Sequence, residues 1–531
     1  MKYVVVTGGV LSGLGKGIST SSIGVLLKSR GLKVCPIKID PYLNVDAGTM
    51  NPYQHGEVFV LDDGAEADLD LGNYERFLDV NLTGDHIITT GKVYRVVIEK
   101  ERRGDYLGKT VQIIPHITDQ IKGMIKAVGE REHADVVLIE VGGTVGDIEG
   151  MPFVEALRQL ALEEGKENVL FVHTTLVPVM GAVGEQKTKP TQQSVRELRS
   201  MGVQPSVIIA RGERSLEPDI KQKIAFFCDV PVEGVISAPD ATTIYDVPLI
   251  FEGQGLTEYV LERLHLASKR EDLKEWREFL DRLKNPKGDV TIALVGKYTH
   301  LKDSYISHIE AFHHAEAAAG VRVNLKWVES MDIEKRGTSM LEDADGILVP
   351  GGFGDRGIEG KTKAIEFARE NGVPFQGVCL GFQLATVEFA RHVLGLGDAN
   401  STEFNPKTKA AVIDLLPEQR DVKAMGATMR LGAHLVDVDP DSKTAKLYGK
   451  EPVNERHRHR YEVNPDYIEK LEAAGLRYMG RSDGGRRMEI LELKGHPYFV
   501  ASQFHPELKS RPLRPSPIHL GLVRAAAERK K

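Results

Sequence analysis

The chain has 531 residues, enough for two or more domains that each bury a hydrophobic core. Its net charge of −7 argues against a general nucleic-acid-binding protein, because such proteins are normally basic. Three cysteines, Cys35, Cys228 and Cys379, are too few for a disulfide framework and fit a reducing cytoplasm. No apolar run approaches the roughly 20 residues that a membrane helix needs. We also find no signal peptide before the first predicted strand, and we expect a soluble cytoplasmic protein.

Short β-rich runs alternate with helical patterns along the chain, which predicts α/β domains built on parallel sheets. The charged, helix-prone stretch 266–289 ends in Asn285-Pro286-Lys287-Gly288 and is predicted to be a partly helical linker. We therefore expect a first domain at 1–265, a linker at 266–289 and a second domain at 290–531. Strands are predicted at 3–6, 34–39, 135–141, 169–174 and 206–210 in the first half, and at 291–296, 346–352 and 498–504 in the second.

The glycine-rich segment 7–20 lies between a predicted strand and a predicted helix. In such a segment glycines admit phosphate groups, a lysine neutralises them and the helix N-terminus faces them. Lys16 is the candidate lysine. The match to the standard phosphate-loop pattern is imperfect, since Val10 replaces its first glycine and Gly17 replaces the Ser or Thr after the lysine. The alternative is a glycine-rich turn that only joins a strand to a helix.

Because Gly17 carries no hydroxyl, a ligand for Mg²⁺ must come from elsewhere in the chain. Asp70 and Glu140, the latter at the end of the strand 135–141, are the candidates. Mg²⁺ binds one or two carboxylates together with phosphate oxygens and waters. An isolated acidic residue is usually only solvated, so each candidate depends on the glycine-rich segment beside it.

Two further segments have unusual loop sequences. Segment 142–149 follows the strand 135–141 at the edge where α/β sheets bind ligands. Segment 187–192 places two lysines on an extended piece before Pro190, which begins a predicted helix to Met201. Two cations beside a helix start suit a second phosphate chain, and a solvated surface loop is the alternative.

In the second half, Gly377-Val378-Cys379-Leu380-Gly381 joins an apolar run to a predicted helix at 385–390. Small residues beside a nucleophile permit the strained turn of a nucleophile elbow, where backbone N–H groups can serve an oxyanion. A deprotonated Cys379 is a better nucleophile than the Ser of the usual signature. His505 could accept its proton and Glu507 could orient the ring, as in a triad. The alternative for a lone cysteine is a buried structural residue.

The run 455–461 alternates Arg with His. By spacing alone it could be a basic nucleic-acid patch or a metal site. The alternation is more typical of an extended segment whose two faces carry different side chains.

The set of Cys379, His505 and Glu507 is similar to the triad of class I glutamine amidotransferases. The chain as a whole resembles the CTP synthase family, with a synthase domain followed by a glutaminase domain. The resemblance implies an α/β protein with an N-terminal P-loop-like, Rossmann-type parallel-sheet domain and a C-terminal α/β amidotransferase domain. The matching segments run in order along nearly the whole chain: 7–18, 38–42, 54–60, 68–71, 99–108, 142–149, 187–192, Cys379 and His505.

The resemblance implies a ligase that aminates UTP to CTP, the last step of de novo pyrimidine nucleotide synthesis. ATP would phosphorylate O4 of UTP, and ammonia released from glutamine at Cys379 would displace the phosphate. Phosphorylation turns a poor leaving group into a good one, so the remaining work is positioning and charge neutralisation. Mg²⁺, activation by GTP, feedback inhibition by CTP and a cytoplasmic homotetramer (a dimer of dimers) without nucleic-acid or membrane partners are also implied.

The family's pattern also assigns site residues. ATP would be bound by Gly13, Leu14, Gly15, Lys16, Gly17, Ile18, Asp70, Asp240 and Ala241, with Lys16 also catalytic at the transferred phosphate and Asp70 and Glu140 holding Mg²⁺. UTP or CTP would be bound by Ser12, Asp147, Ile148, Glu149, Lys187, Thr188, Lys189, Pro190, Thr191, Gln192 and Lys223. Glutamine would be bound by Gly352, Leu380, Gly381, Phe382, Gln383, Glu403 and Arg460, and Arg356 would be linked to GTP.

Two other hypotheses stay open. The chain could be another ATP-driven amidotransferase that acts on a carboxylate acceptor, and protection of Lys187 and Lys223 by uridine nucleotides would separate the two. It could also be a catalytically silent assembly protein. The intact Cys379, His505 and Glu507 set, together with Lys16, argues against silence.

Overall fold

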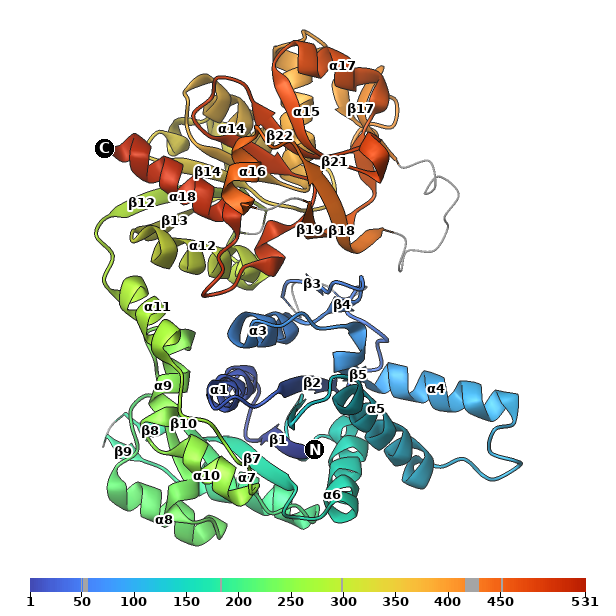
Figure 1. Cartoon of the computed structure of the whole chain (residues 1–531), viewed down its shortest axis with the longest axis vertical. Coiled ribbons are helices and arrows are strands. Elements are labelled where there is room, and N and C mark those ends of the chain that lie inside the picture. The colour runs from blue at the N-terminus through green and yellow to red at the C-terminus, as the bar shows by residue number, and fades with distance from the viewer. Residues whose placement is uncertain (49, 51–55, 182–183, 298, 416–428, 450–451) are drawn as a thin grey trace. The chain divides into compact units, whose positions relative to one another are not determined.

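The computed structural model describes residues 1–48, 50, 56–181, 184–297, 299–415, 429–449 and 452–531 (Figure 1). These residues form two compact units, Met1–Ala47 with Asn73–Lys274 and Gly48–Gly72 with Glu275–Lys531. Residues 48–72 therefore pack with the second unit, whereas the sequence-based division placed them in the first. Polar contacts explain this, because Asp62 and Glu66 pair with arginines of the second unit. Gln54 and His55 of the matching segment 54–60 lie outside the described residues.

The first unit is built on a parallel sheet. Among the described residues its strand order is β11-β10-β7-β1-β6-β2-β5, and every neighbouring pair is parallel. The strands are β1 (Lys2–Gly8), β2 (Val34–Asp40), β5 (Ile87–Thr89), β6 (Val136–Val141), β7 (Val169–Leu176), β10 (Val207–Gly212) and β11 (Val235–Pro239), with a hairpin of β8 (Val179–Met180) and β9 (Glu185–Gln186). The helices are α1 (Lys16–Ser29), α4 (Thr90–Arg103), α5 (Thr118–Arg131), α6 (Met151–Glu164), α7 (Lys189–Ser200), α8 (Pro218–Cys228), α9 (Val247–Glu252) and α10 (Leu256–Arg263).

Both faces of this sheet are buried, which is why its strands are nearly continuous apolar runs. In β1, Tyr3 and Val5 pack into a core with residues of α4, α5 and α6. Val4 and Val6 are also fully buried, on the opposite face. The register pairs Val6 of β1 with Glu140 of β6. The chain after β1 therefore begins next to the carboxyl end of β6, where α/β sheets place ligands.

The second unit contains a mixed sheet. In the described part of the chain its order is β13-β12-β14-β15-β23-β22-β21-β18-β19, parallel from β13 to β23 and antiparallel from β23 to β19. Its strands are β12 (Asp289–Gly296), β13 (Arg322–Glu329), β14 (Gly346–Val349), β15 (Phe375–Val378), β18 (Arg430–Val438), β19 (Val453–His459), β21 (Leu476–Ser482), β22 (Arg487–Leu493) and β23 (Phe499–Ser502). Smaller sheets contain β3 (Phe59–Val60) with β4 (Glu66–Ala67), and β16 (Ala399–Ser401) with β17 (Ala410–Leu415) and β20 (Tyr461–Val463).

Helices cover both faces of the mixed sheet. Ala293 and Val295 of β12 pack in one core with α13, α14 and α15, and Ile292 and Leu294 pack in a second core with α12 and α18. The helices are α11 (Lys274–Lys284), α12 (Ile306–Ala319), α13 (Ser330–Arg336), α14 (Ile358–Glu370), α15 (Leu380–His392), α16 (Lys443–Tyr448), α17 (Pro465–Ala473) and α18 (Pro517–Lys530), while α3 (Leu69–Leu78) crosses the unit boundary at 72/73.

All of the strands predicted from the sequence are present, with ends that differ by a few residues. The stretch 266–289 contains α11, which buries Trp276, Phe279, Leu280 and Leu283. A search of the helices in the described ranges found none with the length and apolar character of a membrane span.

Candidate active sites

Cys379 occupies a sharp turn between β15 and α15, as predicted. Its backbone has φ 51° and ψ −97°, a conformation that is rare for a residue with a side chain. Its N–H donates to Ser502 O at 2.7 Å. The two glycines of the pentapeptide allow close backbone packing. A Cβ on Gly381 would lie 2.1 Å from Val349 O, and one on Gly377 would lie 2.8 Å from the backbone of Gly381.

The three residues of the predicted triad lie together. His505 Nδ1–H donates to Glu507 Oε1 at 2.7 Å. A Cβ on Gly351 would lie 3.0 Å from His505 Cε1 and 3.6 Å from Cys379 Cβ, so both residues pack against the same glycine. His505 Nε2 has no hydrogen-bond partner in the described part of the chain and is available to the thiol.

Charge balance in the triad is set by burial and by the neighbouring groups. Burial alone lowers the pKa of His505, but Glu507 and then Cys379 oppose it and raise that pKa to about 10. Burial raises the pKa of Glu507, but His308 and His505 more than offset this and lower it to about 2. These shifts stabilise the imidazolium and carboxylate pair that forms once His505 has taken the thiol proton.

These residues open onto a cavity of about 450 Å³ within the second unit. Cys379, His505 and Glu507 line it together with Gly351 and Gly352. Further lining residues come from the segment that the second unit takes from the first half of the sequence: Met50, Glu57, Val58 and Val60. The 48–72 segment therefore supplies part of the wall beside the candidate nucleophile.

The predicted glutamine contacts are placed in different ways. Glu403 accepts from Gly354 N at 3.1 Å. Burial raises the pKa of Glu403, whereas the charges of Lys297 and Arg460 lower it, which places Arg460 near Glu403. The Phe382 side chain is buried in the core. Gln383 Nε2 donates to Tyr461 O at 3.1 Å and to Gln503 Oε1 at 3.3 Å, within the protein.

Arg356 and the residues that begin α15 complete the predicted set in this unit. Arg356 is exposed, and its Nε lies 2.8 Å from Met331 Sδ. Leu380 and Gly381 are buried in the first turn of α15 and contribute backbone groups next to Cys379. Gly352 lies on the cavity wall.

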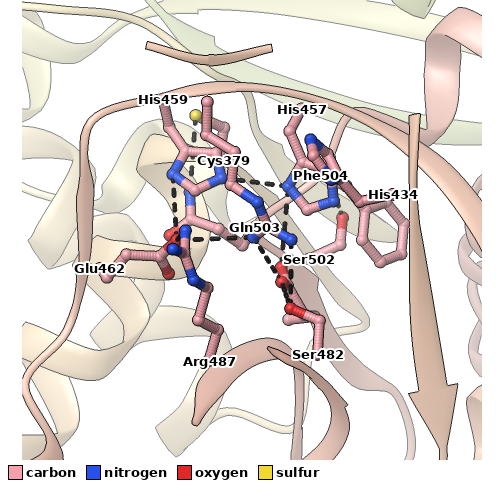
Figure 2. Close-up of polar contacts among 12 residues, drawn as sticks. Cys379, His434, His457, His459, Glu462, Ser482, Arg487, Ser502, Gln503 and Phe504 are labelled. Atoms are coloured by element: carbon pink, nitrogen blue, oxygen red, sulfur yellow. Dashed lines mark hydrogen bonds and ion pairs between the residues drawn. The ribbon is translucent and has the colours of Figure 1, made fainter. Parts of the chain in front are cut away.

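A buried polar cluster lies beside Cys379 (Figure 2). Gln503 Nε2 donates to Cys379 Sγ at 3.7 Å, and Cys379 Sγ–H donates to Arg458 O at 3.7 Å. His457 Nδ1 and His459 Nε2 are 3.0 Å apart. Burial lowers the pKa of both histidines well below the usual value, so both are neutral. The remaining members, Arg430, Glu462, Ser482, Arg487 and Glu489, form ion pairs and hydrogen bonds around them.

The Arg and His residues of β19 point in different directions, as the alternation predicted. Arg456 Nε is 2.5 Å from Asp62 Oδ1, and Arg458 Nε is 2.7 Å from Glu66 Oε1. The histidines belong to the polar cluster on the other side. Carboxylates of the same chain thus balance the charges of Arg456 and Arg458, which argues against a nucleic-acid patch. His457 and His459 contact each other inside the polar cluster.

In the first unit, the segment between β1 and α1 has the backbone of a tight glycine-rich loop. Val10, Gly13 and Gly15 have φ near 80°, and α1 begins directly afterwards at Lys16. Lys16 Nζ donates to Gly143 O at 2.5 Å, which links the loop to segment 142–149. Ser12 and Gly13 are exposed, whereas Leu14 and Gly17 are buried.

Glu140 lies buried at the end of β6, beside this loop. Its Oε1 accepts from Lys38 Nζ at 2.9 Å, and its Oε2 accepts from the hydroxyl of Tyr74. Asp70 lies in the first turn of α3. Carboxylate oxygens at the end of a strand beside a phosphate-type loop are hard donors of the kind that suits Mg²⁺, so the chemistry of Glu140 fits this metal, whereas Asp70 belongs to the second unit.

The remaining nucleotide candidates lie in loops and in helices α7 and α8 of the first unit. Lys187 Nζ is 2.7 Å from Glu185 Oε2, and Lys187 together with Lys223 lowers the pKa of Glu185, so the two lysines flank one carboxylate. Within the next turn, Thr191 donates to Leu176 O, Gln192 donates to Thr188, and Lys189 is exposed. Asp147 Oδ2 accepts from Thr144 N at 2.7 Å, and Ile148 and Glu149 are exposed. Asp240, which precedes Ala241, pairs with Arg211 at 2.6 Å.

Comparisons with known proteins agree with this arrangement. The CTP synthase N-terminus family matches residues 2–266, and the glutamine amidotransferase class-I family matches residues 300–525. The CTP synthase of Thermococcus gammatolerans is 61% identical over 530 residues, covering 100% of this chain and 99% of the relative. The chain belongs to the CTP synthase family. The CTP synthase of Archaeoglobus fulgidus is 60% identical over 526 residues, covering 99% of this chain and 98% of that protein.

Among solved structures, the glutaminase domain of Trypanosoma brucei CTPS with bound acivicin is 42% identical to this chain. It covers 45% of this chain and 94% of its own, with a TM-score of 0.43. The two family matches show that a CTP synthase N-terminal domain and a class I glutamine amidotransferase domain are joined in one chain.

Sequence reasoning missed four buried polar residues near Cys379: Lys297, His308, Lys361 and Gln503. Gln503 had a signal, because residues 503 and 505 share one face of an extended segment. The other three lie on a strand end or on helices whose sequences carry no motif, and only the fold brings them to the cavity.

Proposed function

We propose that this chain makes CTP from UTP, ATP and glutamine at two sites, a glutaminase site and a synthase site. The overall reaction is the glutamine-dependent amination of UTP, driven by ATP. The observation that carries the glutaminase part is the left-handed backbone of Cys379 next to the bonded His505 and Glu507 pair. Family membership over the whole chain carries the synthase part.

In the glutaminase site, His505 Nε2 accepts the thiol proton and Sγ of Cys379 attacks the amide carbon of glutamine. Backbone N–H groups of Gly352 and Leu380 stabilise the oxyanion. The proton on His505 then passes to the leaving nitrogen, and ammonia departs from a thioester. Water, deprotonated by His505, hydrolyses the thioester to glutamate and restores the thiol.

The remaining glutamine contacts position the substrate. Glu403 pairs with the ammonium group and Arg460 with the carboxylate of glutamine. Gly381, Phe382 and Gln383 act through the start of α15, Gly381 by its close packing and Gln383 by holding Gln503. Ammonia passes inside the protein to the synthase site, because ammonium in water at neutral pH is a poor nucleophile.

In the synthase site, Gly13 to Ile18 bind the ATP phosphates at the start of α1, with Lys16 at the transferred phosphate. Asp70 and Glu140 hold Mg²⁺, which neutralises phosphate charge when bound. Ser12, segment 187–192 and Lys223 bind the UTP triphosphate. Asp147, Ile148 and Glu149 recognise the base of the inhibitor CTP, and Asp240 and Ala241 contact adenine.

Regulation and assembly follow the family's pattern. GTP activates the glutaminase through Arg356. The chain works as a homotetramer (a dimer of dimers) without nucleic-acid or membrane partners. Its three free cysteines suit the reducing cytoplasm.

The test compares wild type with Cys379→Ala in the presence of ATP, Mg²⁺ and UTP, and follows CTP by chromatography. We expect the variant to lose synthesis from glutamine and to retain synthesis from ammonium chloride. If wild type makes no CTP from either nitrogen source, the acceptor is not UTP. If Cys379→Ala still uses glutamine, another residue is the nucleophile.

A further inference from the structure

Glu507 contacts a second histidine besides His505. His308, buried on α12, places Nε2 3.5 Å from Glu507 Oε1 and lines the cavity. At this distance the contact is electrostatic rather than a short hydrogen bond, and burial strengthens it because screening is weak. In the described part of the chain Glu507 Oε2 has no hydrogen-bond partner, so the carboxylate depends on the groups around Oε1.

His308 is itself held by a chain of buried polar groups. Its Nδ1 lies 3.2 Å from Nε2 of His519 on α18, and His519 Nδ1 lies 2.8 Å from Ser516 Oγ. The backbone N–H of Ser516 donates to Ser510 Oγ at 3.0 Å. Gln376 Nε2, on β15, also lies 3.3 Å from His519 Nδ1. Residues from α12, α18, β15 and the turn after His505 therefore meet behind the triad.

The Glu507 carboxylate fixes the donor and acceptor of each contact from Glu507 through His308 and His519 to Ser516. Burial lowers the pKa of His308 and lowers that of His519 to about 3, so both rings are neutral and each donates one N–H. Glu507 accepts only, so the proton of His308 is on Nε2 and its Nδ1 accepts from His519 Nε2–H. His519 Nδ1 then accepts from the Ser516 hydroxyl. The tautomers are assigned from this network.

We propose that His308, oriented by His519 and Ser516, is a positioning residue for glutamine hydrolysis that holds Glu507 in place behind His505. This inference rests on the proposed role of Cys379, His505 and Glu507. A catalytic histidine depends on the group that orients it, and that group depends in turn on its own partners. The charged and titratable groups that face His308 are Glu507, His505, His519 and Lys361.

The test measures the glutaminase kcat, KM and pH profile of the full-length protein for wild type, His308→Val, His308→Gln and His519→Phe. Loss of an outer-shell partner of a metal-ligating residue costs about 10–100-fold, and we expect a loss of that order in the kcat of His308→Val, with KM and ammonia-driven CTP synthesis unchanged. The acid limb of kcat should move to higher pH, because the ring N–H of His308 that faces Glu507 favours the ionised carboxylate. His308→Gln, which keeps an N–H donor, should recover much of the rate.

His496→Val is the matched control, because it removes another buried histidine of the same unit whose ring bonds Ala368 O at 3.1 Å instead of a triad residue. If His308→Val keeps the kcat and acid limb of wild type, or changes them no more than His496→Val does, the positioning role is wrong. If wild type shows no glutaminase activity, or Cys379→Ala retains it, the proposed function fails instead. Should His308→Val not fold, ¹⁵N solid-state NMR of histidine-labelled wild type decides the question. A proton on Nδ1 of His308 or of His519 would contradict the proposed series of hydrogen bonds.

Discussion

Arg456 Nε and Asp62 Oδ1 are 2.5 Å apart although 394 positions separate the two residues in the sequence. The Arg456 side chain is fully buried, and Lys509 also reaches Asp62 at 3.3 Å. A buried guanidinium needs such a partner, because an unpaired charge in the interior is costly. This pair therefore fastens the 48–72 segment to β19 and fixes one wall of the cavity beside Cys379.

Replacing Asp62 by Ala should destabilise the second unit by about 1–3 kcal/mol, because Arg456 loses a charged partner. Glutamine-driven CTP synthesis should fall more than ammonia-driven synthesis. The free energy of unfolding from urea titration measures the first effect. Asp343→Ala, which breaks the exposed pair with Lys326, is the control and should change stability by less than about 0.5 kcal/mol. Equal effects of the two variants would contradict the fastening role.

The Asp62 contact also predicts a pH dependence. Burial raises the pKa of Asp62, but Arg456 and Lys509 lower it by a larger amount. The pKa of Asp62 is therefore below its usual value. A carboxyl with a lowered pKa in the folded state adds stability above its unfolded pKa of about 4. That contribution is lost as pH falls through the folded pKa. Acid unfolding of Asp62→Ala should therefore lack the part that wild type shows below about pH 4.

Gly381→Ala should lower the rate of glutamine use by about 10²-fold or more. Its new Cβ would meet Val349 O at 2.1 Å, so the turn that carries Cys379 must move. A displacement of about 1 Å can cost about 10²-fold in rate. Gly397→Ala is the control, since a Cβ there meets no atom within 4 Å. Glutaminase assays of the two variants give the answer, and normal turnover by Gly381→Ala would show that the elbow tolerates the shift.

Glu507→Gln should lower glutaminase kcat by about 10²–10⁴-fold, as loss of the carboxylate does in other triads. It should also move the alkaline limb of kcat to lower pH. Burial lowers the pKa of His505, and Glu507 is the main group that raises it, to about 10. Without that carboxylate His505 loses its proton earlier and cannot protonate the leaving nitrogen. A pH profile from 6 to 11 tests this, and an unchanged alkaline limb would contradict it.

Lys361→Met should stabilise the second unit near neutral pH by about 1–3 kcal/mol. Lys361 is fully buried on α14, where only a 3.5 Å contact to Pro350 O receives it in the described part of the chain. Burial lowers its pKa to about 7, so between pH 7 and 10.5 the unfolded chain binds a proton that the folded chain lacks. Wild-type stability therefore rises with pH in this range, and the advantage of Met shrinks.

Urea unfolding at pH 7 and pH 10 measures this difference. Lys363→Met is the matched control, because Lys363 lies exposed on the same helix. It should change stability by less than about 0.5 kcal/mol at either pH. An advantage of Lys361→Met that is the same at both pH values would contradict burial of the charge as its cause.

The sequence alone predicted the parts of the fold that depend on local pattern. Strands β1, β2, β6, β7 and β10 of the parallel sheet and β12, β14, β15 and β23 of the mixed sheet appeared as apolar runs, and the elbow at Cys379 followed from glycines at fixed positions. The partners of His505 were only half predicted. Glu507 lies two residues after His505 in the sequence. His308 contacts Glu507, and His519 contacts His308, only because α12 and α18 pack together, which no spacing rule encodes. The placement of residues 48–72 was missed for the same reason, since Asp62 and Arg456 meet only in three dimensions.

The chain passes between its two units three times, at 47/48, 72/73 and 274/275. A simple gene fusion of two finished domains would leave a single passage. Cutting this chain near residue 274 would leave residues 48–72 on the wrong fragment, and the C-terminal fragment would expose Arg456 and Arg458 without their acidic partners. The two catalytic modules are therefore interleaved in the polypeptide, and neither could be exchanged for a homologous module by one recombination event at the linker.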